Sequence, residues 1–216
     1  MTNTIDNRSP WAKKQDRLTE REYKRDAVLR TAAELFNEKG FHATSLDEVA
    51  ERLNVSKPTV YYYVKNKDEI LFECVRIGLE MLENASNEAI QSGSDSKENL
   101  IAVMRKYAEI VTMDFGMCLI RVGEDPLPLK SRRKLRRLKS RIDLKFRSLI
   151  QQGIADGVLM PCDPKIAAFT IAGALSWIAR WYDPKGPLRA EDIANQCIDL
   201  LMNGLNSRSP PSSDVN

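Results

Sequence analysis

The sequence of 216 residues predicts an all-α fold. Apolar residues recur three and four positions apart in most segments, which is the spacing that places side chains on one face of a helix. Capping and breaking residues stand where these segments begin and end: Ser45 with Glu48 forms a capping box, Gly40 follows one apolar segment, and Asp163 with Pro164 precedes another. The chain therefore divides into helices joined by turns.

Composition and motifs exclude several classes of protein. Hydrophobic residues make up 43% of the chain and charged residues 29%, which suits a soluble protein with a sizeable core. No uncharged apolar stretch is long enough to cross a membrane and no signal peptide is found, so we expect a cytoplasmic protein without a membrane partner. Catalytic and nucleotide-binding motifs are missing, the four cysteines form no CxxC pair, and His42 is the single histidine. We therefore predict no enzymatic activity, no cofactor and no metal site.

The first 20 residues are polar and show no helical spacing, which predicts a disordered basic arm over 1–20. Its cations could reach the phosphates or the minor groove of DNA, or serve only to solubilise the chain, because acidic residues offset part of the charge. A first helix is predicted from about Glu22 to Lys39, with Gly40 as its C-terminal cap.

The segment from Thr44 to Lys67 predicts two short helices joined by a tight turn. The first begins near Leu46, and the second follows Ser56, with Pro58 in its first turn. Together with the preceding helix they predict a three-helix helix-turn-helix domain over 21–66. The outer face of the second short helix offers an ammonium group and four hydroxyl groups, which suits a major groove, although the tyrosines could also pack on neighbouring helices. These side chains are Lys57, Thr59, Tyr61, Tyr62 and Tyr63.

A family resemblance is carried by the run from Phe36 to Leu71, which reads FNEKGFHATSLDEVAERLNVSKPTVYYYVKNKDEIL. It resembles the DNA-binding domain of the TetR family of bacterial transcriptional repressors. The shared signals are a Gly-aromatic pair after the first helix, an Ala-Thr-Ser start of the second, Val-Ser before the recognition helix, an aromatic run within it, and a lysine opening the fourth helix. The resemblance implies a homodimer that reads a palindromic operator in double-stranded DNA with one recognition helix per subunit.

The resemblance also implies which residues contact DNA. Lys57, Pro58 and Tyr61 stand at positions that usually contact base edges, where the ammonium could donate to guanine and the two rings could meet a thymine methyl. Many relatives carry Gly in place of Pro58 and His in place of Tyr63. The positions at or near phosphate contacts are Thr44, Ser45, Thr59, Tyr62, Tyr63 and Lys67.

A fourth helix is predicted from Lys67 to about Gln91, long enough to link the helix-turn-helix to the second half of the chain, as a ligand-gated repressor would need. After a turn over Ser92 to Asn99, a helix from about Lys97 to Asp114 is apolar around most of its circumference and should lie centrally. Apolar residues then continue to Ile120 before two prolines end the run.

The stretch from Lys130 to Arg147 contains ten Lys or Arg residues and one acid, Asp143. Its apolar residues fall three and four apart, which predicts one amphipathic helix with basic outer faces. Three interpretations remain open: a solvated surface, a site for an anionic ligand such as a phosphate-bearing thioester, and a second contact with DNA or a membrane.

Two further helices are predicted from Asp163 to Tyr182 and from Ala190 to about Asn203. They resemble the pair through which TetR proteins dimerise as a four-helix bundle, and they complete a helical ligand-binding and dimerisation domain over 67–206. The polar, proline-rich residues 207–216 are predicted to form a disordered tail. The predicted dimer interface consists of Ile171, Leu175, Ile178, Ile193, Cys197 and Leu201.

An effector pocket is predicted among the helices at 97–120, 130–155 and 163–182, although the same apolar set could be plain core packing. The phrase WYDPKGPL at 181–188 resembles the end of a TetR subgroup that includes regulators of fatty-acid and sterol breakdown answering to acyl-coenzyme A thioesters. The predicted lining consists of Met104, Tyr107, Val111, Phe115, Phe146, Phe169 and Trp177.

These observations predict a TetR-type repressor that a small-molecule effector, such as an acyl-coenzyme A thioester, releases from its operator. The alternative is a dimeric DNA-binding or partner-recruiting protein without a small-molecule ligand, which a second domain lacking a cavity would favour. The sequence does not separate a repressor from an activator, because the sign of regulation depends on where the operator lies relative to the promoter.

Overall fold

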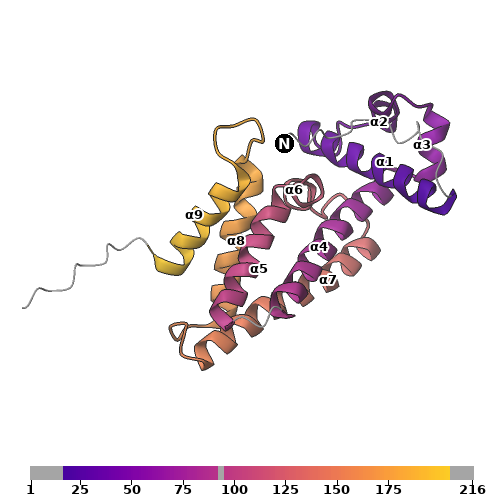
Figure 1. Cartoon of the computed structure of the whole chain (residues 1–216). Helices are drawn as coiled ribbons and strands as arrows, with labels where there is room; N and C mark the ends of the chain where they lie inside the picture. The colour runs from indigo at the N-terminus through magenta and orange to yellow at the C-terminus, as the bar shows by residue number, and fades with distance from the viewer. Residues whose placement is uncertain (1–16, 92–94, 205–216) are drawn as a thin grey trace, which may run out of the picture.

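The computed structural model describes residues 17–91 and 95–204, and within these ranges the chain forms helices and no strand (Figure 1). None of these helices is long and apolar enough to span a membrane. In chain order the helices are α1 (Arg17–Lys39), α2 (Leu46–Leu53), α3 (Lys57–Tyr63), α4 (Lys67–Gln91), α5 (Ser96–Val111), α6 (Asp114–Arg121), α7 (Leu129–Ala155), α8 (Pro164–Trp181) and α9 (Ala190–Asn203).

The first three helices pack around a small apolar core. Val28 of α1, Val49 of α2 and Val60 of α3 are completely buried there. The capping box at Ser45 starts α2, and Asn54 ends it in a left-handed conformation with φ 54°, which a short polar side chain tolerates. These local signals define two short helices that are joined by a tight turn and pack on each other, as predicted for a helix-turn-helix.

Helix α4 runs from the helix-turn-helix into the second half of the chain, where it packs against α5, α6 and α7 (Figure 1). Helix α5 contacts α4, α6, α7, α8 and α9, so the prediction of a central helix is confirmed. The loop between α8 and α9 is short, and α9 packs mainly on α5.

The apolar run after residue 111 is a separate helix, α6, and not a continuation of α5. Helix α5 ends at Val111, and the hydroxyl of Thr112 donates to the Glu109 carbonyl oxygen at 2.7 Å. A glycine permits the close approach of α6 to the end of α5, because a Cβ on Gly116 would lie 1.8 Å from the Ile110 carbonyl oxygen. Hydrophobic periodicity carries no signal for such a close backbone approach.

The other helices begin and end close to the predicted residues, except for the start of α1. Helix α1 begins at Arg17 and not near Glu22, so residues 17–20 of the predicted arm are helical. An ion pair between Lys24 and Glu20, one helical turn apart, supports this extension at 2.5 Å. The rest of the predicted arm and the predicted tail at 207–216 lie outside the described residues.

Candidate nucleic-acid interface and effector cavity

The outer face of α3 presents the three side chains that were predicted to meet DNA bases. Lys57, Pro58 and Tyr61 are all exposed, whereas Val60 is buried and anchors the helix. Lys57 and Tyr61 stand four residues apart, so both project from the same side of the helix. The geometry therefore leaves this surface open to the edges of base pairs.

Lys57 forms an ion pair in the DNA-free protein. Its ammonium nitrogen lies 2.8 Å from Asp47 Oδ1 at the start of α2, and this partner raises the pKa of Lys57. Both side chains are more than half exposed, so the pair is weakly held. A guanine acceptor or a phosphate can displace Asp47 at little cost.

The hydroxyl groups of α3 differ in their access to solvent. Tyr62 is 66% exposed, with the Arg21 guanidinium 5.6 Å from its ring centre. Tyr63 is half-buried, packs against the core and meets the ring of Tyr62 edge-on. The Thr59 hydroxyl is half-buried and lies 2.8 Å from the Ser56 hydroxyl. Of these three predicted phosphate contacts, only Tyr62 is fully available.

The two predicted phosphate contacts before α2 are placed very differently. Ser45 is exposed at the N-terminus of α2, where its hydroxyl accepts the backbone N–H of Glu48 at 3.2 Å. Thr44 is 3% exposed, and its hydroxyl lies within hydrogen-bonding distance of the carbonyl oxygens of Gly40 and Leu35. The Thr44 hydroxyl therefore braces the turn between α1 and α2 and is turned away from solvent.

Lys67 lies at the first residue of α4, and its ammonium group points into the protein. The Nζ atom donates to the carbonyl oxygens of Phe41 at 2.7 Å, Thr44 at 3.0 Å and His42 at 3.3 Å. It also lies 4.5 Å from the centre of the Phe41 ring. Three acceptors match the three protons of an ammonium group, so Lys67 clamps α4 to the turn that begins α2 and leaves no proton for a phosphate.

The second half of the chain contains a cavity of about 260 Å³ bounded by α4, α5, α6, α7 and α8. The α4 and α6 side of its wall is entirely apolar, with Leu79, Leu82, Leu119 and Ile120. The α5 and α8 side adds the hydroxyl groups of Tyr107 and Ser176, and α7 adds two charged residues. The complete lining also includes Lys139, Ile142, Asp143, Phe146, Ala168, Phe169 and Ala172.

Of the seven residues predicted to line a pocket, the structure brings three together around this cavity, namely Tyr107, Phe146 and Phe169. Met104 and Val111 are completely buried in the core away from it. Phe115 faces α1, where the Arg30 guanidinium lies 5.2 Å from its ring, and Trp177 points outward with 65% of its surface exposed. These four residues do not line this cavity, because apolar spacing does not show which side of a helix faces a void.

The sequence analysis missed the polar residues of the cavity. The Tyr107 and Ser176 hydroxyl oxygens lie 2.8 Å apart, and the Tyr107 ring packs edge-to-face on Phe146 at 5.8 Å. Burial raises the pKa of the Tyr107 phenol, so it remains protonated near neutral pH. The one sequence signal for this pair was Ser176, a polar residue among the apolar residues of α8. The sequence alone does not show whether Ser176 lies on the cavity side of that helix.

Two charged residues of α7 line the edge of the cavity. Lys139 pairs with Glu124 at 3.2 Å, and Asp143 pairs with Arg147, whose Nε donates to the carboxylate at 3.0 Å. The Lys139 side chain is 40% exposed, so this edge of the cavity is open to solvent. The cavity therefore combines an apolar interior with an opening where charges are already present.

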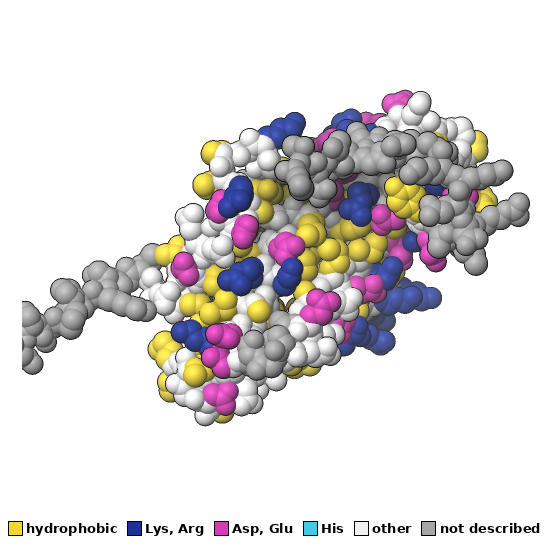
Figure 2. All heavy atoms as spheres, in the orientation of Figure 1, with side chains coloured by type: hydrophobic (Ala, Val, Ile, Leu, Met, Phe, Trp, Pro, Cys, Tyr) yellow, Lys and Arg dark blue, Asp and Glu magenta, His cyan; other side chains and the backbone are white. Residues whose placement is uncertain are grey.

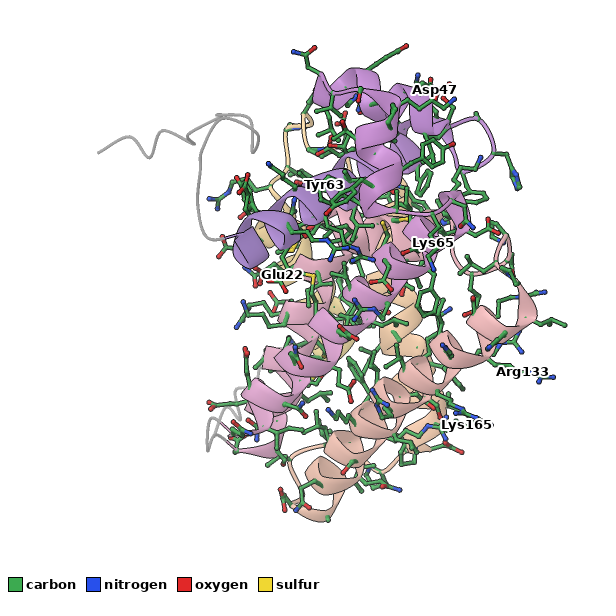
Figure 3. The ribbon with its side chains drawn as sticks, turned by 90° about the vertical axis from the view of Figure 1, so that its right-hand side faces the viewer. Glu22, Asp47, Tyr63, Lys65, Arg133 and Lys165 are labelled. Atoms are coloured by element: carbon green, nitrogen blue, oxygen red, sulfur yellow. The ribbon has the colours of Figure 1, made fainter. Side chains whose placement is uncertain are left out.

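The basic outer faces of α7 are only partly neutralised. Arg141 and Lys145 pair with Glu83 of α4, and Arg136 joins Lys139 at Glu124. Figure 2 shows a cluster of Lys and Arg side chains over the upper end of α7, and Arg133 extends outward there in Figure 3. Among the described residues, Lys130, Arg133 and Arg137 have no acidic partner.

The residues of the predicted dimer interface lie mostly inside the subunit. Ile171, Leu175, Ile178 and Ile193 are buried within the subunit, and Cys197 and Leu201 are half-buried. The exposed apolar residues of α8 form a different stripe at helical spacing, which consists of Ile166, Phe169, Trp177 and Trp181. Both faces of α8 are apolar, so periodicity could not tell the inner face from the outer one.

The two halves of the chain meet where α1 packs on α6. Asn37 donates a hydrogen bond to the Asp114 carbonyl oxygen at 3.0 Å. The carboxyl groups of Glu34 and Asp114 are half-buried at this junction; burial raises the pKa of both, and the Asp114 charge further raises that of Glu34. The nearby Arg30 guanidinium opposes the shift at both groups. The positive charge of Arg30 therefore offsets only part of the cost of burying the two carboxylates.

Two family models match the chain. Residues 28–74 match the model described as bacterial regulatory proteins, tetR family, and residues 93–205, more than half of the chain, match the model of the tetracyclin repressor-like C-terminal domain. The first match covers the helix-turn-helix and the beginning of α4. The second covers the exposed stripe of α8 and all of the cavity lining except Leu79 and Leu82 of α4.

Individual relatives agree with these models. The TetR family regulator PfmR from Thermus thermophilus is 32% identical, with 83% of this chain and 99% of that chain covered and a TM-score of 0.76. The structure of AibR with isovaleryl coenzyme A and operator DNA is 26% identical over 83% of this chain and 98% of that chain, with a TM-score of 0.74. The transcriptional repressor KstR2 of Mycolicibacterium smegmatis is 25% identical over 84% of this chain and 90% of that protein. The chain belongs to the TetR family of DNA-binding transcription regulators.

Proposed function

We propose that the protein is a cytoplasmic, homodimeric repressor without catalytic activity, released from a palindromic operator when an acyl-coenzyme A thioester enters the cavity. The observation that carries the proposal is an apolar cavity with charged residues at its edge, set in a TetR fold. The similarity to AibR, whose structure contains isovaleryl coenzyme A and operator DNA, supports the same ligand class.

The size of the cavity favours a short acyl chain. Its volume of about 260 Å³ is near the lower end of the range for small-molecule sites. The four apolar residues on the α4 and α6 side suit a hydrocarbon chain, which gains free energy by leaving water. The coenzyme A part is too large and too polar for this volume and would remain outside the cavity.

Cations near the cavity edge suit the phosphates of coenzyme A. Lys139 and Arg147 are held by the carboxylates of Glu124 and Asp143, and a phosphate could take the place of either carboxylate. The unpaired cations farther along α7 add a favourable long-range potential.

Dimerisation would use the exposed stripe of α8. Trp177 and Trp181 present large apolar surfaces to solvent, and such residues are enriched at the centres of protein interfaces. Leu200 of α9 is also exposed. A two-fold axis beside α8 would bring equal patches of two subunits together and place two recognition helices on one face of the duplex.

Helix α4 would transmit the presence of the ligand. Leu79 and Leu82 line the cavity, and Lys67 at the start of the same helix is bonded to the turn before α2. A ligand that shifts α4 therefore moves the helix-turn-helix with it. Favouring the DNA-incompetent spacing of the two recognition helices by a few kcal/mol would empty the operator.

The first test is a selection of bound duplexes from a random DNA pool, with the wild type and Tyr61→Ala in parallel. A palindrome bound by the wild type and lost by the variant supports the repressor function, whereas sequence-independent binding by both overturns it. The selected duplex is then titrated with acyl-coenzyme A thioesters of increasing chain length, and free coenzyme A serves as the control. Release by no thioester would overturn the effector assignment and favour the ligand-free alternative.

A further inference from the structure

The hydroxyl groups of Tyr107 and Ser176 form a polar pair inside an otherwise mainly apolar cavity. Tyr107 projects from α5 and Ser176 from α8, and their oxygens lie 2.8 Å apart. Tyr107 is 8% exposed, and the edge-to-face contact with Phe146 holds its ring in place. The pair is therefore a fixed feature of the cavity wall.

One of the two hydroxyl protons of this pair has no hydrogen-bond acceptor among the described residues. Each hydroxyl group has one proton, and the bond between the two oxygens uses one of the two protons. The other proton has no second acceptor among the described residues. A serine in a helix can donate to the carbonyl oxygen four residues earlier, as Ser86 does to Leu82, but no such bond is found for Ser176. Tyr107 is buried and Ser176 is half-buried on the cavity wall, so the spare proton is available to an acceptor that enters the cavity.

The other polar groups of the cavity do not accept this proton. The Asp143 carboxylate is bonded to Arg147 through both of its oxygens. Lys139 has no acceptor atom to offer, and it pairs with Glu124. Burial raises the pKa of Tyr107, so the phenol keeps its proton and cannot serve as the anionic acceptor for Ser176.

We propose that Tyr107 and Ser176 form a subsite that donates a hydrogen bond to a carbonyl oxygen of the effector. This inference rests on the proposed function and specifies it, since the carbonyl would be that of the acyl thioester. The hydrocarbon chain beyond the carbonyl then lies against Leu79 and Leu82 of α4. The subsite thus selects ligands with an acceptor next to an apolar chain, and it orients the chain toward the helix that moves the recognition domain.

The test compares two pairs of ligands by isothermal titration on the full-length wild type and on Tyr107→Phe/Ser176→Ala. The first pair is an acyl-coenzyme A thioester and the thioether in which a methylene group replaces its carbonyl. The second pair has no coenzyme A and consists of a straight-chain methyl ketone and the methyl alkyl sulfide of equal length. We expect the wild type to prefer the carbonyl ligand of each pair by roughly three- to tenfold, and the double variant to lose this preference. The affinity of the double variant for the thioether and the sulfide should remain within about twofold of the wild type, which shows that the cavity is intact.

The two pairs of ligands test the carbonyl subsite separately from the coenzyme A effector. If neither coenzyme A ligand binds but the ketone preference is present and disappears in the double variant, the subsite stands and the coenzyme A assignment falls. A preference for carbonyl ligands that survives in the double variant overturns the subsite, as does a wild type without any preference. The single variants Tyr107→Phe and Ser176→Ala identify the donor, because loss of the donating hydroxyl group has the larger effect.

Discussion

The ammonium group of Lys67 lies 2.7 Å from the backbone carbonyl oxygen of Phe41. This hydrogen bond joins the first residue of the helix that lines the effector cavity to the turn that precedes the helix-turn-helix pair. It gives Lys67 a positioning role, whereas its place in the sequence suggested a phosphate contact. The two roles differ in how DNA binding responds to salt.

Replacing Lys67 by Met should destabilise the protein by about 1 to 3 kcal/mol, because carbonyl groups lose a charged donor. Operator affinity should fall while the salt dependence of binding keeps its slope, because no phosphate contact is lost. Urea unfolding and fluorescence anisotropy at several salt concentrations measure both effects. The control for stability is Lys65→Met, an exposed neighbour, which should leave the free energy of unfolding unchanged. A reduced slope with unchanged stability for Lys67→Met would restore the phosphate role.

Two adjacent tyrosines of α3 should differ in their effect on sequence specificity. Tyr61→Ala should cost about 1 to 3 kcal/mol on the operator and little on random DNA, because the role predicted for Tyr61 is a contact with base edges. Tyr62→Ala should weaken both by similar factors, because the role predicted for Tyr62 is a contact with a phosphate of the DNA backbone. Competition binding with operator and random duplexes distinguishes the two. Equal losses on both duplexes for Tyr61→Ala would remove that residue from base recognition.

A charge on the exposed stripe of α8 should prevent dimerisation. Trp177→Glu replaces a large exposed apolar side chain, and the expected cost to the dimer is about 2 to 4 kcal/mol, with a parallel loss of operator affinity. Leu144→Glu is a suitable control, because Leu144 is similarly exposed but lies on α7. Sedimentation velocity at several concentrations measures the effect. A Trp177→Glu dimer as stable as that of the wild type would place the interface elsewhere.

The junction of α1 and α6 should make stability depend on pH through Glu34. Burial and the charge of Asp114 raise the pKa of Glu34, so the folded protein holds this proton more tightly than the unfolded chain does. The stabilisation is complete below the unfolded pKa and is lost as pH rises through the raised value. Glu34→Gln should therefore raise the unfolding temperature at neutral pH, and the difference should shrink near about pH 4.

Glu38 provides the control of opposite sign for this experiment. Its bond to Arg52 lowers its pKa, so its contribution is present at neutral pH and is lost as pH falls through the lowered value. Glu38→Gln should lower the unfolding temperature at neutral pH, and less so in acid. Thermal unfolding of both variants across the pH range gives the comparison, and shifts of the same sign would contradict the electrostatic account.

The reversal between α5 and α6 should be sensitive to a single methyl group. Gly116→Ala would place a Cβ 1.8 Å from the Ile110 carbonyl oxygen, and the backbone cannot yield as a side chain does. We expect a loss of about 3 kcal/mol or more in urea unfolding. Gly78→Ala is a graded control, because its Cβ would meet the Phe115 carbonyl oxygen at 3.0 Å, and it should cost less. Equal stability of both variants would show that α6 can move away from α5.

The sequence alone was sufficient for most of the helices and for the exposed positions of Lys57, Tyr61 and Tyr62 on α3. Caps such as Ser45 act within a few residues, and the apolar spacing that buries Val60 also leaves Tyr61 outside. These signals are local, so neighbouring residues carry them completely. The helix-turn-helix and the extent of α4 could be predicted for this reason.

Tertiary structure decided the roles of residues whose environment comes from distant parts of the chain. Lys67 is turned inward by carbonyl groups more than twenty residues away, and Tyr107 meets Ser176 across two helices. Helix α8 is apolar on both faces, so only packing shows that Leu175 faces the core and Trp177 faces solvent. A helical period specifies which side chains share a face but not what that face contacts, because the contact depends on how the helices pack in three dimensions.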